Sequence, residues 1–220
     1  MKTFKQFFLE SQQGKLLVIF PGRFQPFHLG HKKLYDLAKK QFPQADFYIT
    51  TADPTTKQLA KEPDRYPFSF EEKKQIIEAT GVPSEEIILT STPYTPKELL
   101  SKYNSDTDKV IFLVGEKDMK EDPRFTFTPL KSGKMSYYQP FKSLDQMASF
   151  KEGEGHGYVY APSTITFNVG GKSIKSASEL RSMFASGDEQ IQKQIVTALV
   201  GNYNPQIHQL LANKLLKTNK

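Results

Sequence analysis

The sequence predicts an α/β protein with a Rossmann-like parallel sheet, helices on both faces of that sheet, and a helical C-terminal tail. Short apolar runs alternate along the chain with amphipathic segments of roughly ten to fifteen residues. Such alternation is typical of right-handed βαβ units, whose parallel strands are buried on both faces. Ligands bind these sheets beyond the carboxyl ends of the strands. We therefore expect a site in the loops that follow the strands.

The predicted strands are short apolar runs bounded by glycine, proline or polar residues. Residues 15–20, between Gly14 and Pro21, are the first and are expected to be buried on both faces. The others cover residues 45–51, 86–90, 109–115, 157–161 and 164–169.

The predicted helices carry start signals in the sequence. Ser69 and Ser176 each have a glutamate three residues later, which is the pattern of a capping box. Thr95 is the expected cap of another helix, with Pro96 at its first helical position. The helices are expected after Gly30 as far as Pro43, at 69–81, at 95–103 and at 176–187, with two short helices in the tail.

The length of 220 residues is enough for one well-cored domain or for two small ones, and one domain is expected. We expect a leader helix over residues 1–14, a domain over 15–187 and a helical tail over 188–220 that packs on the same domain. Residues from about 117 to 150 have no clear period, which predicts a long insertion or lid. The apolar stripes of the tail are expected to be core packing.

Composition and charge limit the classes of function. The absence of cysteine excludes disulfides and thiolate metal sites and is compatible with the cytoplasm, the expected location. No apolar run approaches the roughly 18 to 20 residues of a membrane span. The formal charge of +6 favours an anionic partner, but its lysines are spread along the chain. A small polyphosphate and nucleic acid both remain open, and the oligomeric state is open as well.

The densest motif, "FPGRFQPFHLGH" (20–31), lies between the first predicted strand and a helix. Gly22 and Gly30 would let a ligand approach the backbone, and the N-terminus of a helix carries about +0.5 of an elementary charge. His28 and His31 can donate hydrogen bonds to phosphate oxygens. The pattern favours a polyphosphate. Each candidate residue also has a purely structural alternative. His28 could cap the helix, and His31 could pack on its first turn. Arg181, in the predicted helix at 176–187, could pair with a surface carboxylate.

Three other apparent motifs are incomplete. "GGKS" (170–173) lacks the first glycine of a P-loop, and "GEGHG" (153–157) lacks the third glycine of a dinucleotide fingerprint. "GGKS" is therefore not expected to bind phosphate as a P-loop does, and "GEGHG" is expected to be a flexible turn. A zinc site at His28 and His31 would need further ligands, but the chain has no cysteine and no His/Glu cluster lies near these histidines.

Two motifs resemble those of a known superfamily. "GRFQPFHLGH" (22–31) resembles the HxGH signature of nucleotidyltransferases, with wording closest to nicotinamide-mononucleotide adenylyltransferases of the archaeal type. "IKSASELR" (174–181) is similar to the superfamily's ISxTxxR motif, with Ser178 in place of threonine. "RYPFSFEEKKQI" and "VGEKD" (114–118) resemble weaker segments, although Tyr66 replaces an asparagine. The leader and the insertion also resemble nucleotidyltransferase-like proteins of tailed phages, which implies a phage-encoded protein acting in the host cytoplasm.

The resemblance implies roles for individual residues. His28 and His31 would contact the α-phosphate of a nucleoside triphosphate, and Arg181 would hold the leaving β- and γ-phosphates. Mg²⁺ would be bound mainly through the triphosphate, with no metal ligands supplied by the protein. The other expected nucleotide-binding residues are Pro21, Gly22, Arg23, Phe24, Gly30, Gly115, Asp118, Ser176 and Ser178.

The resemblance also implies the reaction. We expect transfer of a nucleotidyl group, AMP first, to a small phosphorylated acceptor such as nicotinamide mononucleotide, with release of pyrophosphate. A CTP-dependent transfer to a phospho-alcohol and a non-catalytic nucleotide- or nucleic-acid-binding protein are the alternatives. An aminoacyl-tRNA synthetase is disfavoured, because "GKMS" (133–136) lies in the insertion and the chain has no room for tRNA-binding domains. Nucleic acid is not the favoured partner, and no membrane is expected.

Overall fold

The structure is a computed structural model that describes residues 14–121, 125, 127–151, 157–163, 167–174 and 176–216. The predicted leader and most of "GEGHG" lie outside these residues. The chain forms two compact units, each assembled from three separate stretches. The first unit contains Met1–Pro21, Leu37–Thr50 and Tyr94–Thr164, and the second contains Gly22–Asp36, Thr51–Pro93 and Ile165–Lys220.

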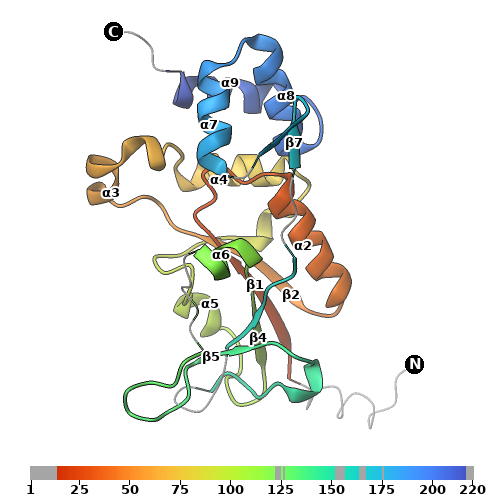
Figure 1. Cartoon of the computed structure of the whole chain (residues 1–220). Coiled ribbons are helices and arrows are strands. Elements are labelled where there is room, and N and C mark those ends of the chain that lie inside the picture. The colour runs from red at the N-terminus through yellow and green to blue at the C-terminus, as the bar shows by residue number, and fades with distance from the viewer. Residues whose placement is uncertain are drawn as a thin grey trace. The chain divides into compact units, whose positions relative to one another are not determined.

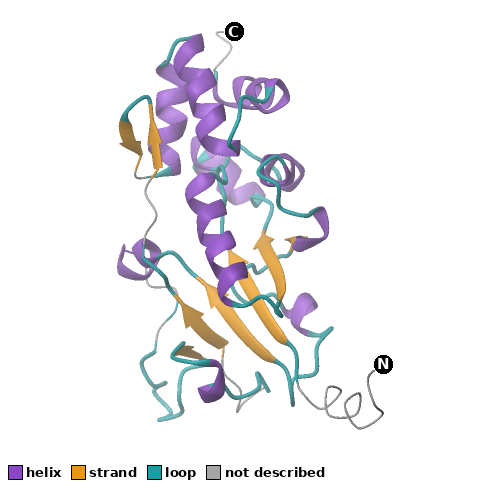
Figure 2. Ribbon diagram, turned by 90° about the vertical axis from the view of Figure 1, so that its right-hand side faces the viewer, coloured by secondary structure: helices purple, strands orange, loops and turns teal. Residues whose placement is uncertain are grey.

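A six-stranded sheet confirms the predicted α/β fold (Figures 1 and 2). Its strand order is β3-β2-β1-β4-β6-β5. Strand β1 is parallel to β2 and β4, and β6 is parallel to β4 and β5. The strands are β1 (Leu16–Pro21), β2 (Asp46–Thr51), β3 (Ile87–Leu89), β4 (Lys109–Leu113), β5 (Tyr138–Pro140) and β6 (Gly157–Tyr160).

The core of the first unit forms around β1 and β4. Every residue of β1 after Leu16 is buried, so the continuous apolar run lies inside the protein as predicted. Leu17, Ile19, Val110 and Phe112 share one cluster with side chains from α5 and from the segment after β4. A separate group of rings, Phe42, Phe141 and Tyr160, packs edge to face with centroids 5.4 to 5.6 Å apart.

The predicted helices form, with one correction at a helix start. Ser69 and Ser176 are N-caps, and each accepts a hydrogen bond from the backbone N–H three residues later. Thr95 is not a cap, because Pro96 itself occupies the N-cap position of a helix only four residues long. The helices are α2 (Leu29–Gln41), α3 (Thr56–Lys61), α4 (Phe70–Glu78), α5 (Lys97–Leu100), α6 (Glu116–Glu121), α7 (Ala177–Ser186), α8 (Glu189–Val200) and α9 (Pro205–Leu215).

The stretch predicted as an irregular insertion contributes to the sheet. Helix α6 opens it, and β5 pairs with β6 at the edge of the sheet. A strand of three residues that ends in Pro140 is too short to show a period of two. The sequence pattern therefore could not reveal β5, whose position depends on long-range pairing.

The second unit contains α7, α8, α9 and a small antiparallel hairpin of β7 (Phe167–Val169) and β8 (Lys172–Ile174) (Figure 1). Gly170 and Gly171 join the two strands with φ angles of 56° and 81°, as a type I′ turn requires. The "GGKS" segment thus contains the turn of this hairpin and the first two residues of β8. Leu199 and Leu211 are fully buried, which confirms that the apolar stripes of the tail are core packing.

None of the helices in the described ranges combines the length and the apolar character needed to cross a membrane.

Candidate functional site

The loop between β1 and α2 folds around aromatic side chains. Phe24 adopts a left-handed backbone conformation with φ of 46°, and a cis peptide bond precedes Pro26. A Cβ atom placed on Gly22 would lie 2.4 Å from the Cζ atom of Phe24. Here it is the Phe24 ring that uses the space left by the glycine, in place of the ligand approach that the sequence suggested. The ring in turn packs edge to face on Phe27, with 5.2 Å between the centroids.

His28 and His31 cap the N-terminus of α2 reciprocally. The backbone N–H of His31 donates to Nδ1 of His28, and the backbone N–H of His28 donates to Nδ1 of His31, both at 3.3 Å. This is the geometry of a capping box in which imidazoles replace the usual Ser and Glu. The two rings stack with centroids 3.7 Å apart. The motif therefore fixes both rings at the end of the helix where backbone N–H groups favour an anion.

The cap also decides where the histidine protons lie. Because Nδ1 of each ring accepts a hydrogen bond, a neutral ring carries its proton on Nε2. Burial lowers the pKa of His28 to about 4. Burial and the neighbouring His28 hold the pKa of His31 well below its ordinary value. Both imidazoles are neutral at pH 7, so each presents an Nε2–H donor without bringing a charge.

Arg181 reaches this loop from α7, 156 residues away from Gln25 in the sequence. Its Nη1 donates to the backbone carbonyl of Gln25, and its Nη2 donates to Oγ of Ser178 at 3.2 Å. Ser176 is the N-cap of α7, with Oγ accepting from the N–H of Glu179 at 3.1 Å. The two motifs that resemble the superfamily's are therefore brought together, as the sequence predicted for a shared site.

Two more arginines lie near Arg181. Its pKa is lowered first by burial and then by Arg23 and Arg65, while Asp64 opposes the shift. Three of the four arginines of the sequence thus gather in the second unit. Arg23 and Arg65 disfavour the charge on Arg181, and a bound anion would favour it. This group of three arginines defines a candidate polyanion site.

Arg65 is a residue that sequence reasoning missed. It ends the 3₁₀ turn Pro63–Arg65, where it pairs with Glu62 at 3.1 Å and lies over the ring of Tyr66. Its only signal was its position at the start of the segment "RYPFSFEEKKQI". Arg65 does not belong to a helical or strand periodicity in the sequence. Its electrostatic effect on Arg181 depends on packing between segments that are far apart in the chain.

The remaining predicted residues divide between the two units. Gly30 is buried in the first turn of α2, and Arg23 is exposed. Pro21, Gly115 and Asp118 belong to the first unit: Pro21 ends β1, Gly115 follows β4, and Asp118 lies exposed on α6. Asp118 Oδ2 would lie 3.2 Å from a Cβ atom placed on Gly115, so the tight turn after β4 favours glycine.

Lys73 is a second residue that the sequence did not single out. Its side chain on α4 is 1% exposed, and its Nζ donates to Oγ1 of Thr51 at 2.9 Å and to the carbonyl of Ala52. Burial lowers its pKa to about 8, against an opposing effect of Asp53. Asp53 accepts a hydrogen bond from the N–H of Phe70 at 2.5 Å. Lys73 and Asp53 together hold the loop after β2 against the start of α4.

The lowered pKa of Lys73 predicts an unusual pH dependence of stability. Between pH 8 and 10.5 the unfolded chain keeps a proton that the folded chain has lost, so the free energy of unfolding rises with pH. The full rise corresponds to about 3 kcal/mol. Lys73→Met should lack it, whereas Lys74→Met, at a surface lysine of the same helix near Glu78, should keep it. Urea denaturation of the three proteins at pH 7.5 and 9.5 checks this, and parallel pH profiles for all three would contradict it.

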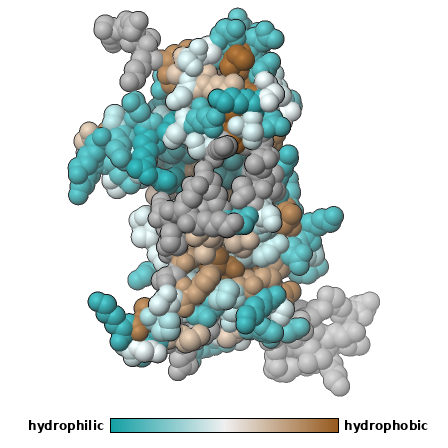
Figure 3. Space-filling view, viewed as in Figure 1, coloured by the Kyte–Doolittle hydropathy of each residue, from teal (hydrophilic) through white to brown (hydrophobic). Residues whose placement is uncertain are grey.

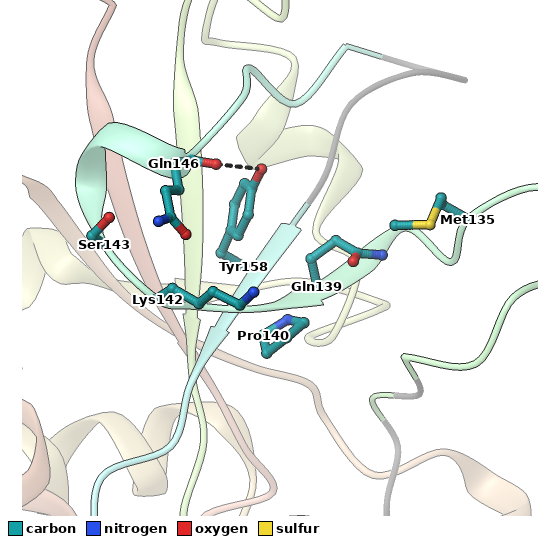
Figure 4. A pocket seen from close by; sticks show the side chains of 7 residues that line it. All are labelled: Met135, Gln139, Pro140, Lys142, Ser143, Gln146 and Tyr158. Carbon is teal, nitrogen blue, oxygen red and sulfur yellow. Dashed lines mark hydrogen bonds between the residues drawn. The ribbon is translucent and has the colours of Figure 1, made fainter.

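Each unit carries a surface hollow. One, in the first unit, measures about 230 Å³ and lies beside β5, where the Tyr158 hydroxyl meets the carbonyl of Gln146 at 3.5 Å (Figure 4). The other lies against α3, whose side chains are all at least partly exposed and largely hydrophilic (Figure 3). Neither hollow is lined by a residue that the sequence assigned to the site.

The fold and this group of residues define an α/β protein with two histidines at a helix start and three arginines in the same unit. The family model described as cytidylyltransferase-like matches residues 19–137, which is more than half of the chain. The chain belongs to the cytidylyltransferase-like family, and this membership indicates nucleotidyl transfer as its general chemistry. A comparison with curated proteins finds no match.

Proposed function

We propose that this protein transfers AMP from ATP to a small phosphorylated acceptor and releases pyrophosphate. One observation carries the proposal: two neutral imidazoles at a helix start and three arginines gather in the second unit. The imidazoles suit the α-phosphate, where negative charge is redistributed during the reaction. The arginines suit the more highly charged β- and γ-phosphates.

In the proposed reaction, an acceptor phosphate oxygen attacks the α-phosphorus in line. The new P–O bond forms as the bond to the α,β-bridging oxygen breaks, and pyrophosphate leaves with the electron pair. The attacking oxygen is already anionic near pH 7, so no general base is needed. Catalysis then depends on positioning and on stabilising charge. Nε2–H of His28 and of His31 would donate to α-phosphate and bridging oxygens, while Arg181 holds the leaving group.

The Mg²⁺ expected for such a reaction would neutralise charge on the triphosphate. Across the described residues, no three His, Asp or Glu side chains gather into a metal site. In the proposal the ion is held mainly by phosphate oxygens, as the superfamily resemblance implies. The part of this chain is to bind the remaining oxygens through Arg23, Arg65 and Arg181.

The acceptor is proposed from the wording of residues 22–31, which favours nicotinamide mononucleotide. The alternative within the same chemistry is CTP with a phospho-alcohol. Pyrophosphate release should be measured with ATP and with CTP against nicotinamide mononucleotide, phosphocholine and glycerol 3-phosphate. We expect the highest turnover with ATP and nicotinamide mononucleotide.

A control variant ties any turnover to this site. Arg181→Met should abolish most of the pyrophosphate release, while Arg65→Met should only weaken it, since the charge of Arg65 is already paired with Glu62. Turnover with CTP and a phospho-alcohol alone would assign the alternative reaction. Retained nucleotide or RNA binding without turnover on the whole panel would refute catalysis and leave a binding protein.

A further inference from the structure

We infer that Gln25 is a positioning residue that holds the histidine loop and Arg181 in one frame. The inference rests on the proposed function, in which both parts contact the triphosphate. Gln25 lies within the motif "GRFQPFHLGH". Its side chain binds the backbone of Phe68. Its role follows from two sets of hydrogen bonds: the side-chain amide binds Phe68, and the backbone carbonyl binds Arg181.

The side chain of Gln25 is bound to the start of α4. Its Nε2 donates to the carbonyl of Phe68 at 2.9 Å, and its Oε1 accepts from the N–H of Phe68 at 3.0 Å. Gln25 is 6% exposed and Phe68 is fully buried, so water does not replace these bonds easily. The amide thus pairs with one backbone residue as a neighbouring strand would.

The partner of Gln25 is itself firmly held. Ser69 and Glu72 form a capping box directly after Phe68, with the Ser69 N–H donating to Glu72 at 2.9 Å. The other carboxylate oxygen of Glu72 pairs with Lys214 of α9 at 2.8 Å. Asp53 accepts the N–H of Phe70. The start of α4 is therefore a fixed reference to which Gln25 ties the loop.

The backbone of Gln25 performs the second half of the role. Its carbonyl accepts the hydrogen bond from Nη1 of Arg181, and Nη2 of the same guanidinium is bound to Ser178. These two bonds orient the plane of the guanidinium. A shift of the Gln25 backbone would displace the carbonyl that binds Arg181. It would also displace the helix cap at His28, which lies three residues later in the chain. One residue thereby couples the α-phosphate contacts to the contacts with the leaving group.

A double-mutant cycle tests this coupling. Arg181→Lys keeps the charge but loses the planar fork, so it should reduce Mg·ATP affinity and turnover in the parent protein. In the Gln25→Met background the carbonyl that binds Arg181 is already displaced. The same change should therefore reduce affinity and turnover by a factor roughly tenfold smaller than in the parent. Gln25→Met alone should lower kcat more than it raises KM, because misplacement affects the reacting geometry.

The control separates positioning from general loosening. Leu211→Val trims a fully buried side chain of α9, a helix of the same unit that lies outside the loop between β1 and α2 in the sequence. In that background the cost of Arg181→Lys should equal its cost in the parent, with thermal unfolding showing that all variants are folded. Calorimetric titration with Mg·ATP or with tripolyphosphate gives the affinities independently of turnover.

The outcomes distinguish this inference from the proposed function. Additive effects of Gln25→Met and Arg181→Lys in a protein that turns over would overturn the positioning role and leave the function standing. Non-additive effects on ATP affinity in a protein without turnover would support the positioning role and remove the catalytic proposal. Absence of both binding and turnover in the parent would overturn both.

Discussion

Replacing His31 by alanine is expected to lower turnover by about 10² to 10³ at pH 7. The imidazole would donate from Nε2 to an oxygen whose charge increases in the transition state, so its loss should appear mainly in kcat. Alanine also removes the acceptor of the His28 N–H and so weakens the helix cap. Loss of activity in this variant alone would therefore not separate chemistry from folding.

His31→Gln makes that separation. Glutamine is a natural residue at the third position of a capping box, so its carbonyl oxygen can accept the N–H of His28. We expect the thermal midpoint to stay near that of the parent while turnover remains reduced by about 10². His208→Ala, which removes an imidazole bound to Tyr203 and Gln192, serves as the matched control and should retain turnover. Parental turnover in His31→Gln would refute the role of the imidazole.

The second large effect is a loss of stability in mild acid. The pKa of His28 is about 4 in the folded chain against 6.5 for an ordinary histidine, and that of His31 is also lowered. Between these values the unfolded chain binds protons that the folded chain does not. The free energy of unfolding therefore falls as pH drops from 6.5 toward 4. His28 contributes up to about 3 kcal/mol to this fall, and His31 adds to it.

The matched variant for this prediction carries His28→Asn and His31→Gln. Asparagine and glutamine suit the N-cap and third positions of the helix but do not titrate. Urea denaturation at intervals between pH 7 and pH 4.5 should show a shallower decline in the variant than in the parent. Carboxylates titrate in both proteins, so their effects cancel in the difference. Superimposable pH profiles would show that the histidines are not held neutral.

Local signals predicted much of the fold. The apolar run of β1 is buried along its length, and the serines at residues 69 and 176 cap their helices as their capping-box pattern indicated. These features depend on near neighbours in the chain. The prediction for Thr95 was wrong because Pro96 takes the cap of a very short helix. Strand β5 and helix α3 escaped prediction because short elements carry no readable period.

The sequence by itself determined the parallel α/β class, the glycine and histidine motif between β1 and α2, and the arginine motif on α7. Periodicity, capping and short spacings express these features within a few residues. Only the tertiary structure decided that Arg65 joins Arg23 and Arg181, that Lys73 is buried, and that Gln25 binds Phe68 while its carbonyl holds Arg181. These groups are brought together by packing between distant segments, where burial changes pKa values and strengthens hydrogen bonds. No local pattern in the chain records such an environment.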